Sequence, residues 1–343
     1  MDHPCAPTRA AMSTPAERSA QEEPNSPPPA VPVSFLVTSY NKAAYLPLVL
    51  DSVWHEAKAV GGEIILVDDG SMDDSDRICE DFAERRAVAC YWRQENRGVY
   101  ATINSVAAKA RGDWVRFCDS DDPLVPGSTR RLIEVAEENG AGVAYGGSIP
   151  YGPEPLSMDR IAPRDAAPGA CSVHPDGLMY LIREMNFTPS MAIYRREALN
   201  DALPLPLDLV SCQDLATLFP VLFRSKLAAV DEPVCFNLKG APNQLSANYA
   251  LTIHQTIRIT QRYADLLSPR HKRAALLKAA NRTRRWLRKI GGSRHGLGSQ
   301  LWLLSVVARA GFGLHDFKTT LGRIAEFYEH DLEPLLARRA KPF

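Results

Sequence analysis

Short apolar runs alternate with amphipathic segments along the first half of the chain, and this alternation constrains the fold more than any other feature. The runs VSFLVT (33–38) and EIILVD (63–68) have the length and the β-branched residues of buried strands. Between them, YLPLVLDSVWHEA (45–57) carries apolar residues at helical spacing. A strand, a helix and a second strand in this order predict a parallel sheet covered by helices.

The same alternation continues to about residue 240. The Pro- and Gly-rich region 148–176 lacks a clear period, and we interpret it as a long loop. From about residue 250 only helical patterns follow, so we place a domain boundary near residue 245. Further strands are expected at 87–93, 114–118, 142–147 and 227–237, helices at 100–110, 127–139 and 211–225, and a strand leading into a helix within 186–199.

Composition excludes several classes of protein. The 40 basic residues balance the 40 acidic ones, so no net field favours nucleic acid as a partner. The seven cysteines form no CxxC pair, which argues against a disulfide framework and favours a reducing cytoplasm. The eight histidines show no ligand spacing, and this argues against a zinc site. Residues 1–31 have the composition of a disordered tail, without a signal peptide. The most apolar later run, 301–307, is far shorter than the ~20 residues that cross a bilayer.

Polar residues follow three of the expected strands, in the loops TSYNK (38–42), DDGS (68–71) and DSDD (119–122). Because the carboxyl ends of parallel strands meet at one edge of a sheet, these loops can converge on one ligand. Asp119 and Asp121 lie two residues apart, so a turn would let both face one Mg²⁺ ion, with phosphate oxygens completing its shell. Taken alone, DSDD is more often a solvated loop or a helix cap than a metal site.

A receiver domain is one alternative, since it also gathers acids at strand ends around Mg²⁺. It has only about half the required length, however, and offers no place for a motif beyond residue 200.

Read in order, four motifs are more specific: VSFLVTSYNKAAYLPLVLDSV, EIILVDDGSMDDS, ENRGV and ARGDWVRFCDSDDPLVPGS. They resemble glycosyltransferase family 2, the inverting enzymes with a GT-A fold, closely over about 33–147 and more loosely to about 240. The resemblance implies an α/β fold with a mostly parallel, Rossmann-like sheet flanked by helices. We therefore expect a GT-A domain at 32–245 and a helical extension at 246–343.

The resemblance also implies roles for individual residues. Asp121 would be the principal ligand of Mg²⁺ or Mn²⁺, and Asp119 would lie nearer the ribose and the metal. Asp69 would hydrogen-bond the base of the donor nucleotide. The other residues of these loops would hold the base and ribose (Thr38, Tyr40 and Asn41) or orient their neighbours (Ser120 and Asp122).

An inverting transferase also needs a carboxylate that takes the proton of the acceptor hydroxyl. In the family this base is the Asp of a Glu-Asp pair at the start of a late helix, and the match here is Asp214 in SCQDLATLFPVL. Gln213 departs from the family at the preceding position. The alternative is that Asp214 is an ordinary helix-start residue, favoured there by the macrodipole.

Two departures bear on the substrates. The family often has Ala-Arg-Asn after ENRGV, whereas this chain has Thr-Ile-Asn at 102–104, so Arg97 or a later basic residue would have to contact the diphosphate. The segment RTRRW (282–286) lacks the Gln that begins the Gln-x-x-Arg-Trp motif of processive members. We interpret it as coincidence and expect transfer of a single sugar, with a UDP-sugar as the first choice of donor.

The segment 271–290 carries eight Lys or Arg and no acid, with apolar residues at helical spacing. Two interpretations stay open: peripheral binding to the inner membrane surface, or a helix packed on the catalytic domain with a solvated basic face. The resemblance implies a saccharide or lipid-linked acceptor, as in bacterial surface polysaccharide synthesis.

Two other functions compete with this one: a GT-A protein that binds sugar nucleotides without catalysis, and a sugar nucleotidyltransferase. The latter would need a Gly-rich, basic first loop for a triphosphate, and VTSYNKAAY is not such a loop.

Overall fold

The structure is a computed structural model that describes residues 32–86, 90–154, 156, 169–184, 187–241, 248–289, 297–310 and 316–337. The expected disordered tail at 1–31, the boundary near residue 245 and the middle of the expected loop at 148–176 lie outside the described residues.

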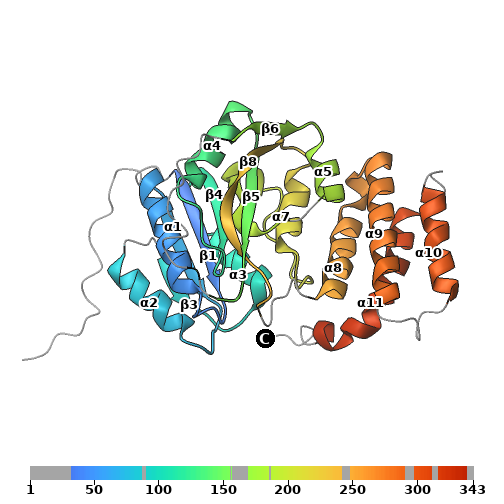
Figure 1. Cartoon of the computed structure of the whole chain (residues 1–343), viewed down its shortest axis with the longest axis horizontal. Helices are drawn as coiled ribbons and strands as arrows, with labels where there is room; N and C mark the ends of the chain where they lie inside the picture. Colours follow the sequence, from blue (N-terminus) through green and yellow to red (C-terminus); the bar gives the residue numbers. More distant parts are fainter. Residues whose placement is uncertain are drawn as a thin grey trace, which may run out of the picture. The chain divides into compact units, whose positions relative to one another are not determined.

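Within these residues one mixed sheet has eight strands in the order β3-β2-β1-β4-β7-β5-β8-β6 (Figure 1). The first four strands of this order run parallel to one another, and β7 is inserted antiparallel between β4 and β5. The expected α/β class with a mostly parallel sheet is confirmed. The strands are β1 (Val33–Ser39), β2 (Glu63–Asp68), β3 (Cys90–Arg93), β4 (Trp114–Asp119), β5 (Val143–Tyr151), β6 (Cys171–His174), β7 (Ala192–Arg195) and β8 (Leu227–Leu238).

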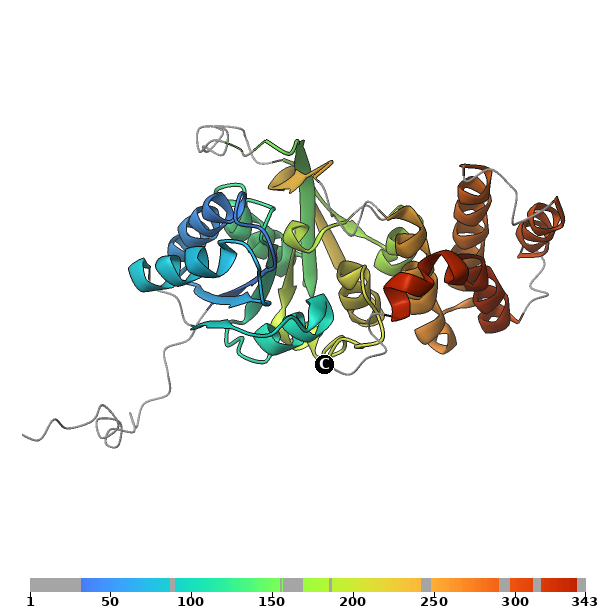
Figure 2. The ribbon, with the colours of Figure 1, turned by 90° about the horizontal axis from the view of Figure 1, so that it is seen from below.

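Helices cover the sheet and then continue beyond it (Figures 1 and 2). After about residue 250 every element among the described residues is a helix, as expected. The helices of the first part are α1 (Leu46–Val60), α2 (Ser75–Arg85), α3 (Gly98–Ala107), α4 (Ser128–Glu138), α5 (Gly177–Glu184), α6 (Arg196–Leu199) and α7 (Gln213–Val221), with a 3-10 turn η3 (Pro189–Met191). The extension contains α8 (Tyr249–Arg262), η5 (Ala264–Leu266), α9 (Pro269–Lys289), α10 (Leu297–Ala310) and α11 (Phe317–Ala337).

The central strands are apolar along their whole length because both of their faces are covered. Every residue of β2 is buried, and successive side chains enter different cores. Ile65 belongs to the core that includes Tyr100 of α3, whereas Ile64 belongs to the core that includes Leu50 of α1. This two-sided burial explains why VSFLVT and EIILVD read as continuous apolar runs.

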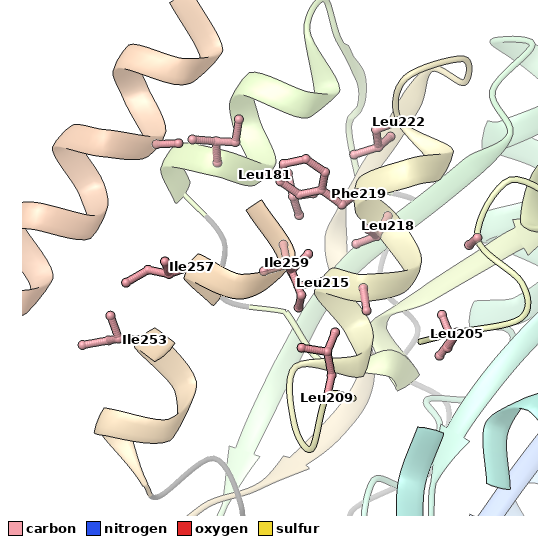
Figure 3. Close-up of a cluster of buried hydrophobic side chains, with 14 of the residues drawn as sticks. Leu181, Leu205, Leu209, Leu215, Leu218, Phe219, Leu222, Ile253, Ile257 and Ile259 are labelled. Carbon is pink, nitrogen blue, oxygen red and sulfur yellow. The ribbon is translucent and has the colours of Figure 1, made fainter. Parts of the chain in front are cut away.

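The helical extension shares its core with the sheet domain. Leu215, Leu218 and Phe219 of α7 lie beside Ile259 of α8 and Leu181 of α5 (Figure 3). All five side chains are buried, and each contributes roughly 1.5–3 kcal/mol through burial. The chain from residue 31 onward forms one compact unit. The division into domains at 32–245 and 246–343 stays a prediction.

The loop expected at 148–176 is partly wrong. β5 continues to Tyr151, which pairs with Leu238, and β6 occupies Cys171–His174. Two glycines in β5 hide the strand pattern, and one of them is required by close packing: a Cβ on Gly146 would lie 2.4 Å from the side chain of Val234. The register of β5 on β8 also shifts around these glycines.

Candidate active site

A cavity of about 880 Å³ opens at the carboxyl ends of β1, β2, β4 and β8 and continues past the start of α7 to α8 and α9. Nearly all the residues that the sequence put forward line it. They are Thr38, Tyr40, Asp69, Asp119, Ser120, Asp121, Asp122, Gln213 and Asp214; Asn41 is not among the lining residues. Segments that are almost 180 residues apart in the sequence are thus brought to one site, although the individual roles stay predictions.

The DSDD loop is fixed from behind by hydrogen bonds to two other segments. The backbone N–H of Asp119 donates to Ser190 Oγ at 3.0 Å. The buried carboxylate of Asp122 accepts from Thr188 Oγ1 at 3.1 Å, from Asn237 Nδ2 at 3.2 Å and from the Leu238 N–H at 3.2 Å. Asp122 therefore ties the end of β4 to the start of η3 and to the end of β8, and its role in orienting its neighbours stays a prediction.

The carboxylates of this loop lie close together, and nearby positive charge compensates them only in part. Burial, together with the carboxylates of Asp122, Asp121 and Asp214, raises the pKa of Asp119 well above its ordinary value, and Lys42 opposes the shift. Burial and Asp121 raise the pKa of Asp122 to about 7. Lys42 Nζ lies 2.5 Å from Asp121 Oδ2 and is the cation that this structure provides.

These residues fit a hard divalent cation. Among the described residues, no hydrogen-bond donor contacts the Asp119 carboxylate. In the same part of the chain no group of three or more His, Cys, Asp or Glu could hold a metal ion. Mg²⁺ needs no such group, because it is commonly held by one or two carboxylates and completed by water and phosphate oxygens.

Asp214 is the second residue of α7 and faces the same cavity. Burial raises the pKa of its carboxyl to about 6, and a 2.8 Å hydrogen bond from the Leu215 N–H opposes the shift. The helix is entered through Cys212, whose φ of 64° lies in the left-handed region. Such a conformation costs a non-glycine residue on the order of 1–3 kcal/mol and is found preferentially at functional sites.

The end of the cavity beside β1 and β2 is built by contacts between loops. The Asp69 carboxylate accepts from Gln94 Nε2 at 2.7 Å and from the backbone N–H groups of Arg97 and Gly98 at 2.9 and 3.0 Å. Asp69 therefore fastens the ENRG loop, and its contact with a base stays a prediction. Asn41, with a φ of 52°, accepts from the Met72 N–H through Oδ1 and so joins the first loop to the second.

A buried arginine that the sequence interpretation missed supports the loop from inside the sheet. Arg116 of β4 is fully buried and donates to Thr129 Oγ1 at 2.6 Å and to the Val234 carbonyl at 2.9 Å. Its guanidinium lies 3.8 Å from Glu56, which in turn accepts from the N–H groups of Gly127 and Thr129. The sequence did indicate a structural role for Arg116, because a charged residue in the middle of the apolar strand WVRFC must be buried with partners.

The basic segment 271–290 forms most of α9 and is packed against other helices. Leu276, Trp286 and Leu287 are buried, and the Trp286 ring lies 4.5 Å from that of Tyr328. This arrangement agrees with the interpretation of a helix packed on the rest of the protein. Membrane binding stays a prediction, and only the exposed basic side chains of α9 could contribute to it. Within the residues that the structure describes, no helix is both long and apolar enough to cross a membrane.

Comparison with known sequences gives a consistent assignment. The family model of glycosyl transferase family 2 matches residues 34–203. The uncharacterized glycosyltransferase EpsJ of Bacillus subtilis is 36% identical over 107 residues, 31% of each chain. The succinoglycan biosynthesis protein ExoO of Rhizobium meliloti is 33% identical over 121 residues, 34% of each chain. The chain thus spans about a third of the length of these relatives.

Solved structures share the fold. TarS of S. aureus, in a complex with UDP-GlcNAc, superposes with a TM-score of 0.58 at 19% identity, over 90% of this chain and 87% of that one. The mannosyltransferase PcManGT of Pyrobaculum calidifontis, in complex with GDP-Man and Mn²⁺, gives 0.50 at 16% identity, over 90% and 91%. With its GT-A-like sheet, its converging acidic loops and the family match at 34–203, the chain belongs to glycosyltransferase family 2.

Proposed function

We propose that the protein is an inverting glycosyltransferase that moves a single sugar from a nucleotide-diphosphate donor to a hydroxyl of a saccharide or lipid-linked acceptor. One observation carries the proposal: the carboxylates of Asp119, Asp121 and Asp214 line one cavity although they come from distant segments. A role in bacterial surface polysaccharide synthesis is supported by the similarity to ExoO, a succinoglycan biosynthesis protein.

The donor would lie with its base and ribose among Thr38, Tyr40 and Asp69, which line the cavity beside β1 and β2. We propose a UDP-sugar; TarS was solved with UDP-GlcNAc, whereas PcManGT was solved with GDP-Man. Asp121 and Asp119 would hold Mg²⁺ or Mn²⁺, which supplies positive charge to the leaving diphosphate. Lys42 would then give up its contact with Asp121 or share that carboxylate.

Asp214 would act as the general base. Its pKa of about 6 leaves it largely ionised at pH 7 and still basic enough to accept a proton as the hydroxyl oxygen attacks. The attacking oxygen approaches the anomeric carbon from the side opposite to the diphosphate, so the configuration inverts in a single displacement. Burial in the cavity wall fixes the carboxylate for this role, and the left-handed Cys212 sets the direction of the helix that carries it.

The test is an Asp214→Asn variant, because an amide keeps the shape of the carboxylate and removes its basicity. We expect UDP to bind with unchanged affinity in the presence of Mn²⁺, measured by calorimetry. Turnover of a panel of sugar nucleotides should fall by about 10²–10⁴-fold, the usual contribution of a general base. Glu80→Gln on the exposed side of α2 is the matched control. Wild-type turnover in Asp214→Asn would exclude the assignment.

A further inference from the structure

The cavity continues well past Asp214, between α7 and the helical extension. In both ribbon views α7 lies between the sheet and α8 (Figures 1 and 2). The lining beyond Asp214 comes from one face of α8 and from α9, with Leu181 of α5 and Leu321 of α11. A transferase that uses Asp214 as its base must bring the acceptor hydroxyl to that carboxylate. This far part of the cavity is therefore the space open to the rest of the acceptor.

Two cations of α9 line this space, Lys278 and Arg282, one helical turn apart. Neither forms an ion pair or a side-chain hydrogen bond with another described residue; the guanidinium of Arg282 lies over the ring of Tyr249, 5.3 Å from its centre. Burial and Arg282 lower the pKa of Lys278 to about 8, and Glu184, at the exposed end of α5, only partly opposes them. Two like charges at this spacing destabilise a helix, so the protein keeps them at a cost.

Arg282 lies close to the reacting end of the cavity. Burial and the Asp214 carboxylate raise the pKa of the Cys212 thiol to about 12, and the Arg282 guanidinium acts in the opposite direction. The cation is thus within electrostatic range of a residue only two positions before the proposed base. An anion held by Arg282 would position a neighbouring hydroxyl near Asp214.

The residues of α8 that line this space can contact a sugar. Thr252, Thr256 and Thr260 repeat along α8 at one-turn spacing, and each hydroxyl donates to the carbonyl four residues earlier. Their oxygens keep lone pairs that can accept from sugar hydroxyls. Ile253 and Ile257 lie on the same face and offer apolar contact (Figure 3).

We propose that Lys278 and Arg282 form a subsite for an anionic group of the acceptor, a phosphate or a carboxylate. The inference rests on the proposed transferase function and narrows its acceptor to an anionic saccharide or a phosphate-linked one. Arginine matches such oxyanions with two parallel hydrogen bonds, and lysine adds a point charge. The donor's diphosphate is the competing ligand, because a basic residue later than Arg97 could also contact it; the proposed metal site at the β4 loop would balance part of its charge.

The first experiment measures binding of glucose 6-phosphate and of glucuronate by calorimetry without divalent metal, together with binding of UDP in the presence of Mn²⁺. We expect the wild type to bind at least one of the two anions, and the pair of probes separates phosphate from carboxylate. The double variant Lys278→Gln/Arg282→Gln should bind that anion at least 10-fold more weakly and bind UDP unchanged. Arg288→Gln, on the exposed side of α9, is the charge-matched control and should behave as the wild type.

Each alternative outcome is decisive. Equal anion binding by the double variant and the wild type, or no anion binding by the wild type, would overturn the proposal. A parallel loss of UDP affinity in the double variant would assign the pair to the donor's diphosphate and overturn it too. Wild-type protein that binds an anion through the pair but does not bind UDP with Mn²⁺ would uphold the anion site while overturning the proposed donor.

A second measurement needs no variant and so does not depend on whether the double variant folds. A lysine with a pKa of about 8 reacts with amine reagents faster than an exposed lysine does. Inorganic phosphate should slow the labelling of Lys278 at pH 8, followed by mass spectrometry, and leave the exposed Lys58 unaffected. The measurement is repeated with glucuronate, and a labelling rate of Lys278 that neither anion changes would contradict the subsite.

Discussion

The two ends of the cavity carry opposite charge, and different kinds of structure hold them in place. We call the loop 119–122 the acidic end, and Lys278 and Arg282 of α9 the basic end. The acidic end comes from four consecutive residues, 119–122, and it is held by a network that reaches Thr188, Ser190 and Asn237. The basic end consists of Lys278 and Arg282 on the inward side of a long helix, on which Arg273, Arg285 and Arg288 are exposed. The proposed metal site is thus fixed by many contacts, as precise ligand geometry requires, whereas the proposed acceptor subsite consists of two charged side chains on one helix.

The largest loss of binding is expected from removing one carboxylate of the acidic end. Asp121→Ala should abolish metal-dependent nucleotide binding, because it deletes the carboxylate that is proposed as the principal ligand. We expect UDP affinity in the presence of Mn²⁺ to fall by more than about 100-fold, the usual outcome when an ion loses a charged ligand from a small set. Calorimetry with and without Mn²⁺ measures this loss. Asp265→Asn, in the extension, is the control and should bind as the wild type. Metal-dependent binding that survives in Asp121→Ala would move the metal site elsewhere.

A change in stability tests whether the buried arginine supports the acidic end. Arg116→Met should lower the free energy of unfolding by about 3–5 kcal/mol, because it leaves Glu56 buried without its ionic partner. Urea denaturation followed by circular dichroism measures the change. A double variant with Glu56→Gln should recover part of the loss, since it removes the orphaned charge. A loss below about 1 kcal/mol, typical of a surface ion pair, would show that the network contributes little.

A pH profile separates the base from the metal site. The pKa of Asp214 is raised to about 6 by burial, and only the ionised carboxylate can accept a proton. Turnover should therefore be constant above this pH and fall about tenfold per pH unit below it. In Asp214→Asn the residual turnover should lose this dependence while keeping its dependence on Mn²⁺. A profile that keeps the same midpoint in the variant would assign the titration to another group.

The fold was largely predictable because its central strands are buried on both faces and so appear as continuous apolar runs. The end of β5 and the four residues of β6 were not, because Gly146 and Gly147 break the alternation and the first two residues of β6 are exposed. The resemblance to the family singled out the acids at 119–122 and Asp214, which line one cavity, and their roles stay predictions. Lys278 and Arg282 were not singled out, since eight basic residues in 271–290 look alike and only the packing of α9 decides which of them face the cavity.

The smallest effect concerns Lys42, a cation at the acidic end of the cavity. Lys42 pairs with Asp121 in a partly buried contact, so a divalent ion must displace or share it. Lys42→Met should therefore strengthen Mn²⁺ binding in the absence of nucleotide by about fivefold, equivalent to an ion pair of ~1 kcal/mol. Calorimetric titration measures this change, and Lys239→Met is the matched control, because Lys239 lines the same cavity at the end of β8. Weaker Mn²⁺ binding in Lys42→Met would contradict this expectation. It would mean that Lys42 holds the Asp121 carboxylate in place for the metal, so that a cation would contribute to binding at both ends of the cavity.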